Sequence, residues 1–133
     1  MFTEKEIEYM KSQMLARIAT VSEDGQPDAS PVGSEIADGY IYVGGYNNPA
    51  TRKYHNIADG NTLVAIVFDD LISVDPWRPR GIRVYGTADL VERDSYAGQG
   101  TYIQITPTVS WSWNVEDPAM EDGEFTTRRT VHN

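Results

Sequence analysis

The clearest candidate for chemistry in this sequence is the run Thr51-Arg52-Lys53, at the start of a predicted second helix. The first turn of a helix leaves backbone N–H groups free and carries partial positive charge. An arginine fork, a lysine charge and a hydroxyl at that end provide the chemistry of a phosphate-binding site. An ordinary solvated helix start is the alternative interpretation.

Proline and glycine residues within predicted strands form a second set of candidates. Pro31 removes a backbone donor and Gly33 removes a side chain from one strand, while Gly44 and Gly45 end the next. Such positions mark bulges or places where a ligand approaches the backbone closely. A flat ring lying on the backbone of residues 31–34 would need that space. A simple bend of the sheet is the alternative.

Two further pairs of residues have types suited to ligand binding. Trp111 and Trp113 alternate with serines, so both indoles face one side of a strand. They either pack in a core, stack on a planar cofactor or lie in a dimer interface. Arg78 and Arg80 lie in a stiff, proline-braced segment, where they either hold an anionic tail or only decorate the surface.

The sequence lacks the residues of most self-sufficient active sites. It has no cysteine, and its two histidines, His55 and His132, lack the spacing of a metal-binding pair. A G-x-S-x-G motif is absent, and the carboxylates are dispersed. Any difficult chemistry must therefore come from a cofactor, and no metal site is predicted. No catalytic side chain stands out; Tyr46, Tyr54 or solvent could donate a proton.

The charge balance limits the partners. Twenty acidic and eleven basic side chains give a net charge of -9. This disfavours nucleic acids and anionic membranes, because both require a basic surface. No apolar stretch approaches the roughly 20 residues of a membrane helix. Because the acidic N-terminal segment also lacks the features of a signal peptide, we expect a cytoplasmic protein.

Hydrophobic periodicity gives the elements that must position these residues. Thr3 and Glu6 form a capping-box pattern that predicts an N-terminal helix, with Ile7, Met10 and Met14 near helical spacing. The other predicted elements are strands over residues 15–21, 29–36, 40–43, 62–68, 82–91 and 102–105 and a short helix over residues 51–58.

The remaining segments are less regular. The strand over residues 62–68 is apolar on both faces, which predicts complete burial. Residues 69–80 contain two prolines and are predicted as a long loop, and Pro107 is predicted to begin a turn. Residues 114–133 form a tail that either folds back as an extra strand or stays mobile.

Six short strands and two short helices favour a mainly β fold, a six-stranded antiparallel barrel with an N-terminal helix and one inserted helix. A single domain spanning residues 1–133 is expected from the length. A doubly wound α/β fold is disfavoured, because there are too few helices to cover a parallel sheet and no G-x-G-x-x-G follows a strand.

The order of these features resembles the pyridoxamine 5'-phosphate oxidase-like family, whose fold is the FMN-binding split β-barrel. The resemblance covers residues 15–113, through the stretches LARIATVSEDGQPDASPVGSE, DGYIYVGG, TRKYHNIADGN, VAIVF and IRVYGTADLV. Within that family, DDLISVDPWRPRGIRVYGTA and ITPTVSWSW are most similar to a branch that uses the deazaflavin coenzyme F420. The collinear set, rather than any single motif, carries the resemblance.

This resemblance implies a homodimer with two cofactors bound in clefts between the subunits. Arg52 and Lys53 match cations that hold the cofactor phosphate, and Trp111 matches an aromatic residue contributed across the dimer. Gly81 stands where oxidase relatives place a side-chain amide near the ring. The implied cofactor-binding residues are Ser30, Pro31, Val32, Gly33, Ser34, Val43, Gly44, Thr51, Arg52, Lys53, Arg78, Arg80 and Trp111.

The implied activity is a reductase in which reduced F420 delivers hydride to an electron-poor C=C or C=N of a small planar substrate. Oxidase relatives carry a basic, histidine-bearing substrate motif that the sequence after Trp113 does not reproduce. Oxidation of pyridoxamine phosphate is therefore not expected. The alternatives are an FMN-binding oxidase or flavin-reductase-like protein, and a non-catalytic protein that binds a cofactor or haem.

Overall fold

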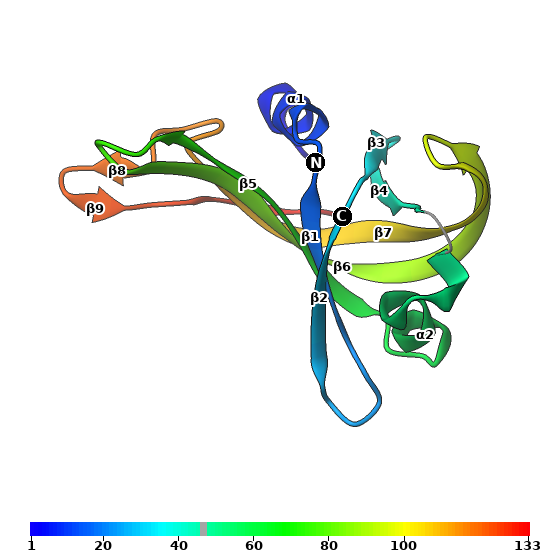
Figure 1. The fold of residues 1–133 in the computed structure, drawn as a ribbon. Coiled ribbons are helices and arrows are strands. Elements are labelled where there is room, and N and C mark those ends of the chain that lie inside the picture. The colour runs from blue at the N-terminus through cyan, green and yellow to red at the C-terminus, as the bar shows by residue number, and fades with distance from the viewer. Residues whose placement is uncertain (46–47) are drawn as a thin grey trace.

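The computed structural model of the chain describes residues 1–45 and 48–133. Strands make up most of it, and one helix lies above the sheet while a second lies beside its lower end (Figure 1). The elements are α1 (Glu4–Ser12), β1 (Ala16–Val21), β2 (Pro27–Val32), β3 (Glu35–Ala37), β4 (Tyr40–Val43), η1 (Asn48–Ala50), α2 (Arg52–Ala58), β5 (Leu63–Ser73), β6 (Arg78–Ser95), β7 (Gly98–Trp113), β8 (Met120–Glu121), β9 (Glu124–Phe125) and β10 (Arg128–Val131).

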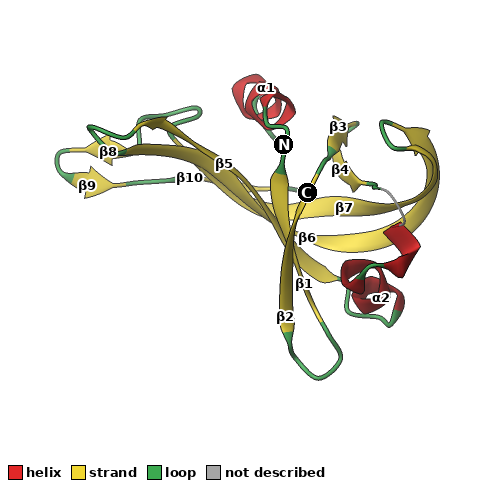
Figure 2. Ribbon diagram, in the orientation of Figure 1, coloured by secondary structure: helices red, strands yellow, loops and turns green. Residues whose placement is uncertain are grey.

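The main sheet has eight antiparallel strands in the order β2-β1-β5-β6-β7-β4-β3, with β10 also paired to β7 (Figure 2). β8 and β9 form a separate hairpin. The predicted class is therefore confirmed: a mainly β, antiparallel fold with an N-terminal helix and one short inserted helix. The structure has more strands than the six predicted.

The N-terminal helix begins as its capping pattern predicts. The Thr3 hydroxyl accepts from the Glu6 N–H (3.1 Å), and Glu6 Oε1 accepts from the Thr3 N–H (3.0 Å). The other carboxylate oxygen of Glu6 accepts from Ser112 Oγ of β7 (2.7 Å), which ties α1 to the sheet. The helix ends at Ser12, so Met14 lies outside it and is exposed. Neither α1 nor α2 has the length and apolar composition needed to cross a membrane.

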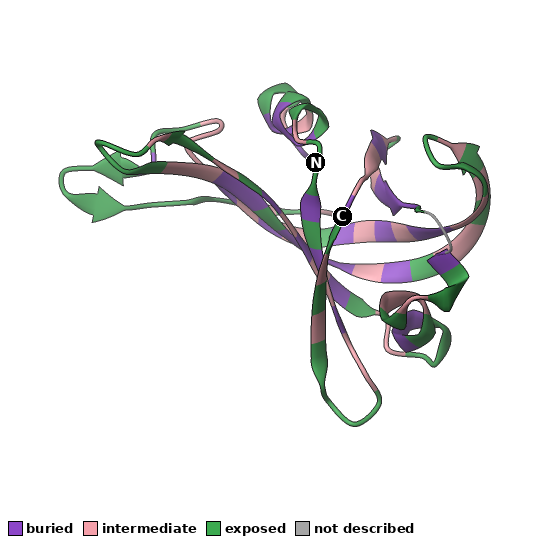
Figure 3. Ribbon diagram, in the orientation of Figure 1, coloured by how far each residue is buried: buried purple, intermediate pink, exposed green. Residues whose placement is uncertain are grey.

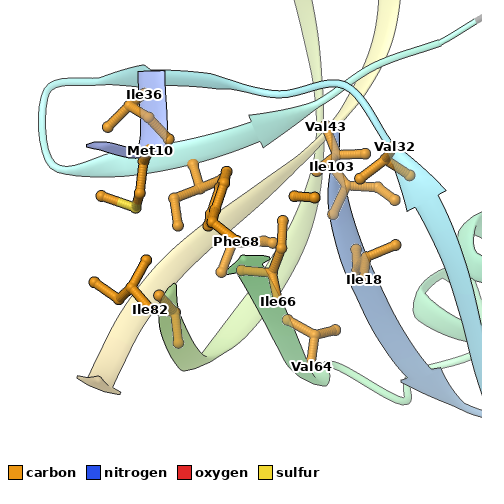
Figure 4. Packing of buried hydrophobic residues seen from close by; sticks show 14 of the residues in the cluster. Met10, Ile18, Val32, Ile36, Val43, Val64, Ile66, Phe68, Ile82 and Ile103 are labelled. Atoms are coloured by element: carbon orange, nitrogen blue, oxygen red, sulfur yellow. The ribbon is translucent and has the colours of Figure 1, made fainter. Parts of the chain in front are cut away.

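The core lies against one face of the sheet, where buried and exposed residues alternate along the strands (Figure 3). Val64, Ile66 and Phe68 of β5 point into it together with Ile18 and other apolar side chains (Figure 4). The prediction that this strand is buried on both faces is wrong. Leu63 is 73% exposed, and the other outward residues of β5 are only partly covered. An apolar outer face therefore remains uncovered in the single chain.

The predicted loop over residues 69–80 is also wrong. β5 and β6 continue as a paired arm to Ser73 and Arg78, with an irregularity in the register after Leu71. The Arg80 guanidinium donates to both carboxylate oxygens of Asp70, at 2.9 and 2.6 Å, across this arm. Ion pairing between the two strands thus supports the β5–β6 ladder over residues 69–80, where the two prolines had led to the prediction of a loop.

Pro107 does not begin a turn. β7 runs through it, and the pairing of β6 with β7 shifts register where Gly86 faces Pro107. Proline cannot donate to a ladder, so it is accommodated at this irregularity. Residues 128–131 of the tail form β10, which extends the sheet beside Trp111 and its neighbours on β7.

A polar cluster at Glu35 gives the fold an acid-sensitive contact. Ser95 Oγ and Arg93 Nε donate to this carboxylate at 2.6 and 2.9 Å. The Ser95 hydroxyl, followed by the Arg93 guanidinium, holds the pKa of Glu35 below its usual value. A group whose folded pKa is depressed stabilises the fold above its unfolded pKa of about 4.3, and that stabilisation is lost as the pH falls through the folded pKa.

We therefore expect the wild type to lose more free energy of unfolding between pH 6 and pH 3 than Glu35→Gln loses. Urea denaturation at a series of pH values measures this difference. Identical acid dependence in the two proteins would contradict the assignment.

Candidate functional site

The predicted phosphate-binding residues lie at the start of α2, which is fixed against the sheet. Thr51 Oγ1 caps the helix by accepting from the Tyr54 N–H (3.4 Å) and donates to the Asn48 carbonyl (2.7 Å). Asn56 Nδ2 donates to Thr20 Oγ1 of β1 in a buried contact (3.0 Å), and Ile57 packs in the core. These contacts hold the first turn of α2 at one end of the β1–β2 hairpin.

Arg52 and Lys53 place two positive charges in the first turn of α2. Arg52 is exposed, and Lys53 is partly buried. Burial lowers the pKa of Lys53, while the Asp28 carboxylate of β2 opposes that shift. Within the described residues, neither cation lies within 4.0 Å of a carboxylate. Because α2 has only seven residues, few peptide dipoles align, so the side-chain charges carry most of the attraction for an anion.

The strand β2 lies at the edge of the sheet and pairs with β1, the strand to which α2 is tied by Asn56. Ser30 Oγ is buried and has no hydrogen-bond partner within the described residues. An unpartnered buried hydroxyl is costly, so it is a candidate contact for a bound group. Val32 and Val43 of β4 are both buried in the core (Figure 4). Of these two residues, only the backbone is available to a ligand.

Two tyrosine side chains, Tyr96 and Tyr102, occupy the space beside Gly33 and Gly44. The Tyr96 hydroxyl accepts from the Gly44 N–H (2.5 Å) and donates to the Gly33 carbonyl (2.8 Å). The ring of Tyr102 lies where a side chain at residue 44 would be. Tyr96, near the tip of the β6–β7 hairpin, thus joins the ends of β2 and β4. The sequence interpretation, which explained these glycines by a ligand or by a bend of the sheet, missed both tyrosines.

Gly44→Ala is expected to destabilise the protein by about 1–3 kcal/mol, because the new methyl group overlaps three atoms of the buried Tyr102 ring. Gly45→Ala is the matched control, since no atom of the described residues lies within 4 Å of its added carbon. Chemical denaturation of the two variants measures the difference. Equal stabilities would show that Tyr102 moves aside without cost.

The structure does not bring Trp111, Arg78 or Arg80 to α2 within one chain. Trp111 is four strands from Pro31 along a continuous register row through β1, β5 and β6. That separation is roughly 19 Å at the usual strand spacing. Trp111 lies under the Arg83 guanidinium, whose carbon is 4.4 Å from the ring centroid. Arg80 is paired with Asp70, so its charge is already compensated.

Arg78 begins β6 on the exposed arm, and Ser34 lies between β2 and β3 beside Gly33. Tyr46, one candidate proton donor, lies outside the described residues. Tyr54 is on α2 with its ring edge-on to His55. Among the described residues, no group of three potential metal ligands comes together.

Sequence interpretation also missed the role of Trp113. A carbon added to Gly81 would lie 2.6 Å from the Trp113 ring and 2.7 Å from the Phe68 carbonyl. The indole therefore fills the position where a side chain would project from Gly81. The sequence contains both residues, a glycine directly before one predicted strand and a tryptophan far along the chain. Their direct pairing between β6 and β7 could not be predicted from neighbouring residues.

Comparison with known proteins places these features among related chains. The family profile described as "Pyridoxamine 5'-phosphate oxidase" matches residues 2–116. A Streptomyces rimosus protein, 5a,11a-dehydrotetracycline/5a,11a-dehydrooxytetracycline reductase, is 35% identical over 122 residues, covering 86% of this chain and 84% of that protein.

Solved structures share the fold at lower identity. The conserved protein Rv2991 from Mycobacterium tuberculosis has a TM-score of 0.67 at 21% identity, covering 92% of this chain and 93% of that chain. A heme binding protein from Mycobacterium smegmatis has a TM-score of 0.69 at 14% identity, covering 98% of this chain and 59% of that chain. At these identities the likeness concerns the fold alone.

Proposed function

The chain belongs to the pyridoxamine 5'-phosphate oxidase family and is an oxidoreductase, and from this premise we propose that it is a reductase using the deazaflavin coenzyme F420. Its substrate in this proposal is a planar, multi-ring molecule with an electron-poor C=C or C=N. The Streptomyces rimosus relative is named as a reductase of dehydrotetracyclines, which are oxygenated four-ring molecules.

The observation that carries the proposal is the pair of cations at the start of α2. Arg52 and Lys53 have no carboxylate within ion-pairing distance in the described part of the chain, and Asp28 of β2 acts on Lys53 only from farther away. A partly buried ammonium is unfavourable unless an anion compensates it. A cofactor phosphate provides that anion, and the unpartnered Ser30 hydroxyl provides another contact on the same strand.

In this proposal the chain contributes binding and positioning. Arg52, Lys53 and the Thr51 hydroxyl hold the phosphate, and the backbone of β2 near Gly33 lies along the ring. When bound, reduced F420 supplies hydride, and the protein holds the acceptor carbon close to it. The second hydrogen arrives as a proton from solvent or from a tyrosine such as Tyr54, which completes a two-electron reduction of the double bond.

A second copy of the chain completes the site in this proposal. The outer face of the sheet carries Ala19, Ala65 and Tyr85 in one register row, and a groove of about 470 Å³ runs along it. Its lining is mostly apolar and includes the exposed side chain of Leu63. Apolar surface of this kind is typical of a subunit interface. A dimer across it would allow Trp111 to reach the partner's cofactor.

Ala65→Arg is expected to convert the dimer to a monomer, because it places a charge in the middle of the apolar face. Light scattering coupled to size-exclusion chromatography measures the mass. Ala58→Arg, at an exposed position on α2, is the control and should leave the mass unchanged. A wild-type protein that is monomeric at all concentrations would contradict the proposed interface.

The function is tested by equilibrium titration of the cofactor-free protein with F420 and with FMN. We expect tighter binding of F420, together with enzyme-dependent oxidation of reduced F420 by a dehydrotetracycline-type acceptor. Preferential binding of FMN would favour the flavin-dependent alternative. Binding of F420 without turnover by any acceptor would favour a cofactor-binding protein.

A further inference from the structure

The outer face of the sheet carries a second groove, separate from the apolar one. It has a volume of about 700 Å³ and lies where β1, β5, the β5–β6 arm and the end of β7 meet. Its aromatic walls are Trp113 and Trp77, and Trp77 is 65% exposed. Cavities of 300–1,000 Å³ are the usual size for small-molecule sites.

The shape of this groove depends on Gly81. Asp69, Gly81 and Trp113 form one register row across β5, β6 and β7. Because Gly81 has no side chain, the Trp113 indole lies against the β6 backbone, 2.6 Å from where a Cβ would be. An indole held this way presents a broad apolar surface to the groove. Flat rings stack favourably on such a surface.

The polar groups of the groove are paired and nearly neutral in sum. Arg17 lies 3.9 Å from Asp69, and both side chains are about half exposed, so they retain hydrogen-bonding capacity. Arg80 and Asp70 are bound to each other, and the Tyr9 hydroxyl also donates to Asp70 (2.9 Å). Compensated charges do not attract a strongly anionic group such as a phosphate. They do suit the hydroxyl and carbonyl edge of an uncharged or zwitterionic molecule.

The groove adjoins the strand assigned to the cofactor ring. Arg17 is paired directly with Pro31 of β2 on one side and with Val67 of β5 on the other. Directly paired residues project from the same face of a sheet. The groove therefore begins one strand away from the β2 backbone, and on the face from which Pro31 projects.

We propose that this groove is the binding site of the acceptor substrate, a flat, oxygenated, multi-ring molecule that stacks on Trp113 and Trp77. This assignment rests on the proposed reductase function for its role in the reaction. The tryptophans provide stacking area, and Arg17 and Asp69 provide hydrogen bonds to the oxygenated edge. The phosphate end of the cofactor remains at α2, where Arg52 and Lys53 have no carboxylate within 4.0 Å among the described residues.

The test is equilibrium dialysis of the cofactor-free, full-length protein against tetracycline in a buffer containing EDTA, followed by tetracycline absorbance. We expect Trp77→Ala and Trp113→Leu each to weaken binding on the order of tenfold. Phe125→Ala removes an exposed aromatic ring outside the groove and should leave binding unchanged. Because Trp77 is exposed, its replacement tests the groove even if Trp113→Leu fails to fold.

The outcomes separate the groove from the proposed function. Retained tetracycline binding in Arg52→Ala/Lys53→Ala, with loss in the tryptophan variants, supports a substrate site distinct from the phosphate site. Tetracycline binding that neither tryptophan variant changes, or no binding by the wild type, overturns the assignment. If tetracycline binds in the groove but F420 does not bind the wild type, the groove stands and the proposed function fails.

Discussion

Replacing both Arg52 and Lys53 by alanine is expected to weaken F420 binding by about two to four orders of magnitude. A charge-assisted hydrogen bond to phosphate contributes about 1.5–3 kcal/mol, and each side chain supplies at least one in the proposed complex. Both residues belong to the first turn of α2, and the buried Asn56–Thr20 contact fixes that helix independently of them. The substitutions should therefore change affinity without changing the fold. Fluorescence titration with F420 measures the dissociation constant.

The matched control is Lys5→Ala/Lys11→Ala on α1. It removes the same number of positive charges, from exposed positions away from α2. If affinity falls equally in both double variants, the effect comes from the overall charge of an acidic protein rather than from a local site. An unchanged affinity in Arg52→Ala/Lys53→Ala would remove the phosphate site altogether.

Phe68→Ala is expected to lower the free energy of unfolding by about 3–5 kcal/mol, a large part of the stability of a domain of this size. The Phe68 side chain is fully buried in the middle of the core, among residues of β5, β6 and α1 (Figure 4). Its removal leaves a cavity that the paired strands around it cannot close. Urea denaturation followed by circular dichroism measures the loss.

Leu63→Ala provides the comparison on the same strand. Leu63 is largely exposed in the single chain, so its truncation should change the unfolding free energy of a monomer by only about 0.5 kcal/mol. In the proposed dimer Leu63 lies in the interface, and its loss would appear in the dimer dissociation constant. Equal destabilisation by the two substitutions would contradict the inward and outward assignment of β5.

Local patterns predicted the elements that depend on short-range signals. The capping box at Thr3, the helix after Thr51 and the strand over residues 40–43 all follow from neighbouring residues. The arm of β5 and β6 was missed because residues 69–80 contain two prolines, which are typical of loops. What holds it is pairing between strands, including Arg80 with Asp70, and that pairing is not visible in either strand alone.

The residues of the candidate site also fall into those that local sequence predicts and those that it does not. The cations of α2 could be found from residue type and position, because a helix start and two adjacent positive charges are local features. Tyr96 and Trp113 could not, since their partners are distant in the sequence: Gly33 and Gly44 follow the ends of β2 and β4, and Gly81 lies on β6. A glycine in a strand signals that something approaches closely, but the sequence does not say whether that is a ligand or another side chain.

The Tyr96 hydroxyl gives the Gly44 amide a partner that belongs to a different hairpin. Most sheet amides exchange their hydrogen with solvent only when a strand separates from its neighbour. The Gly44 amide is released whenever the tip of the β6–β7 hairpin lifts, even while every strand stays paired. Its exchange in deuterated solvent therefore reports local opening where the β6–β7 tip contacts the ends of β2 and β4, on a timescale of minutes to hours.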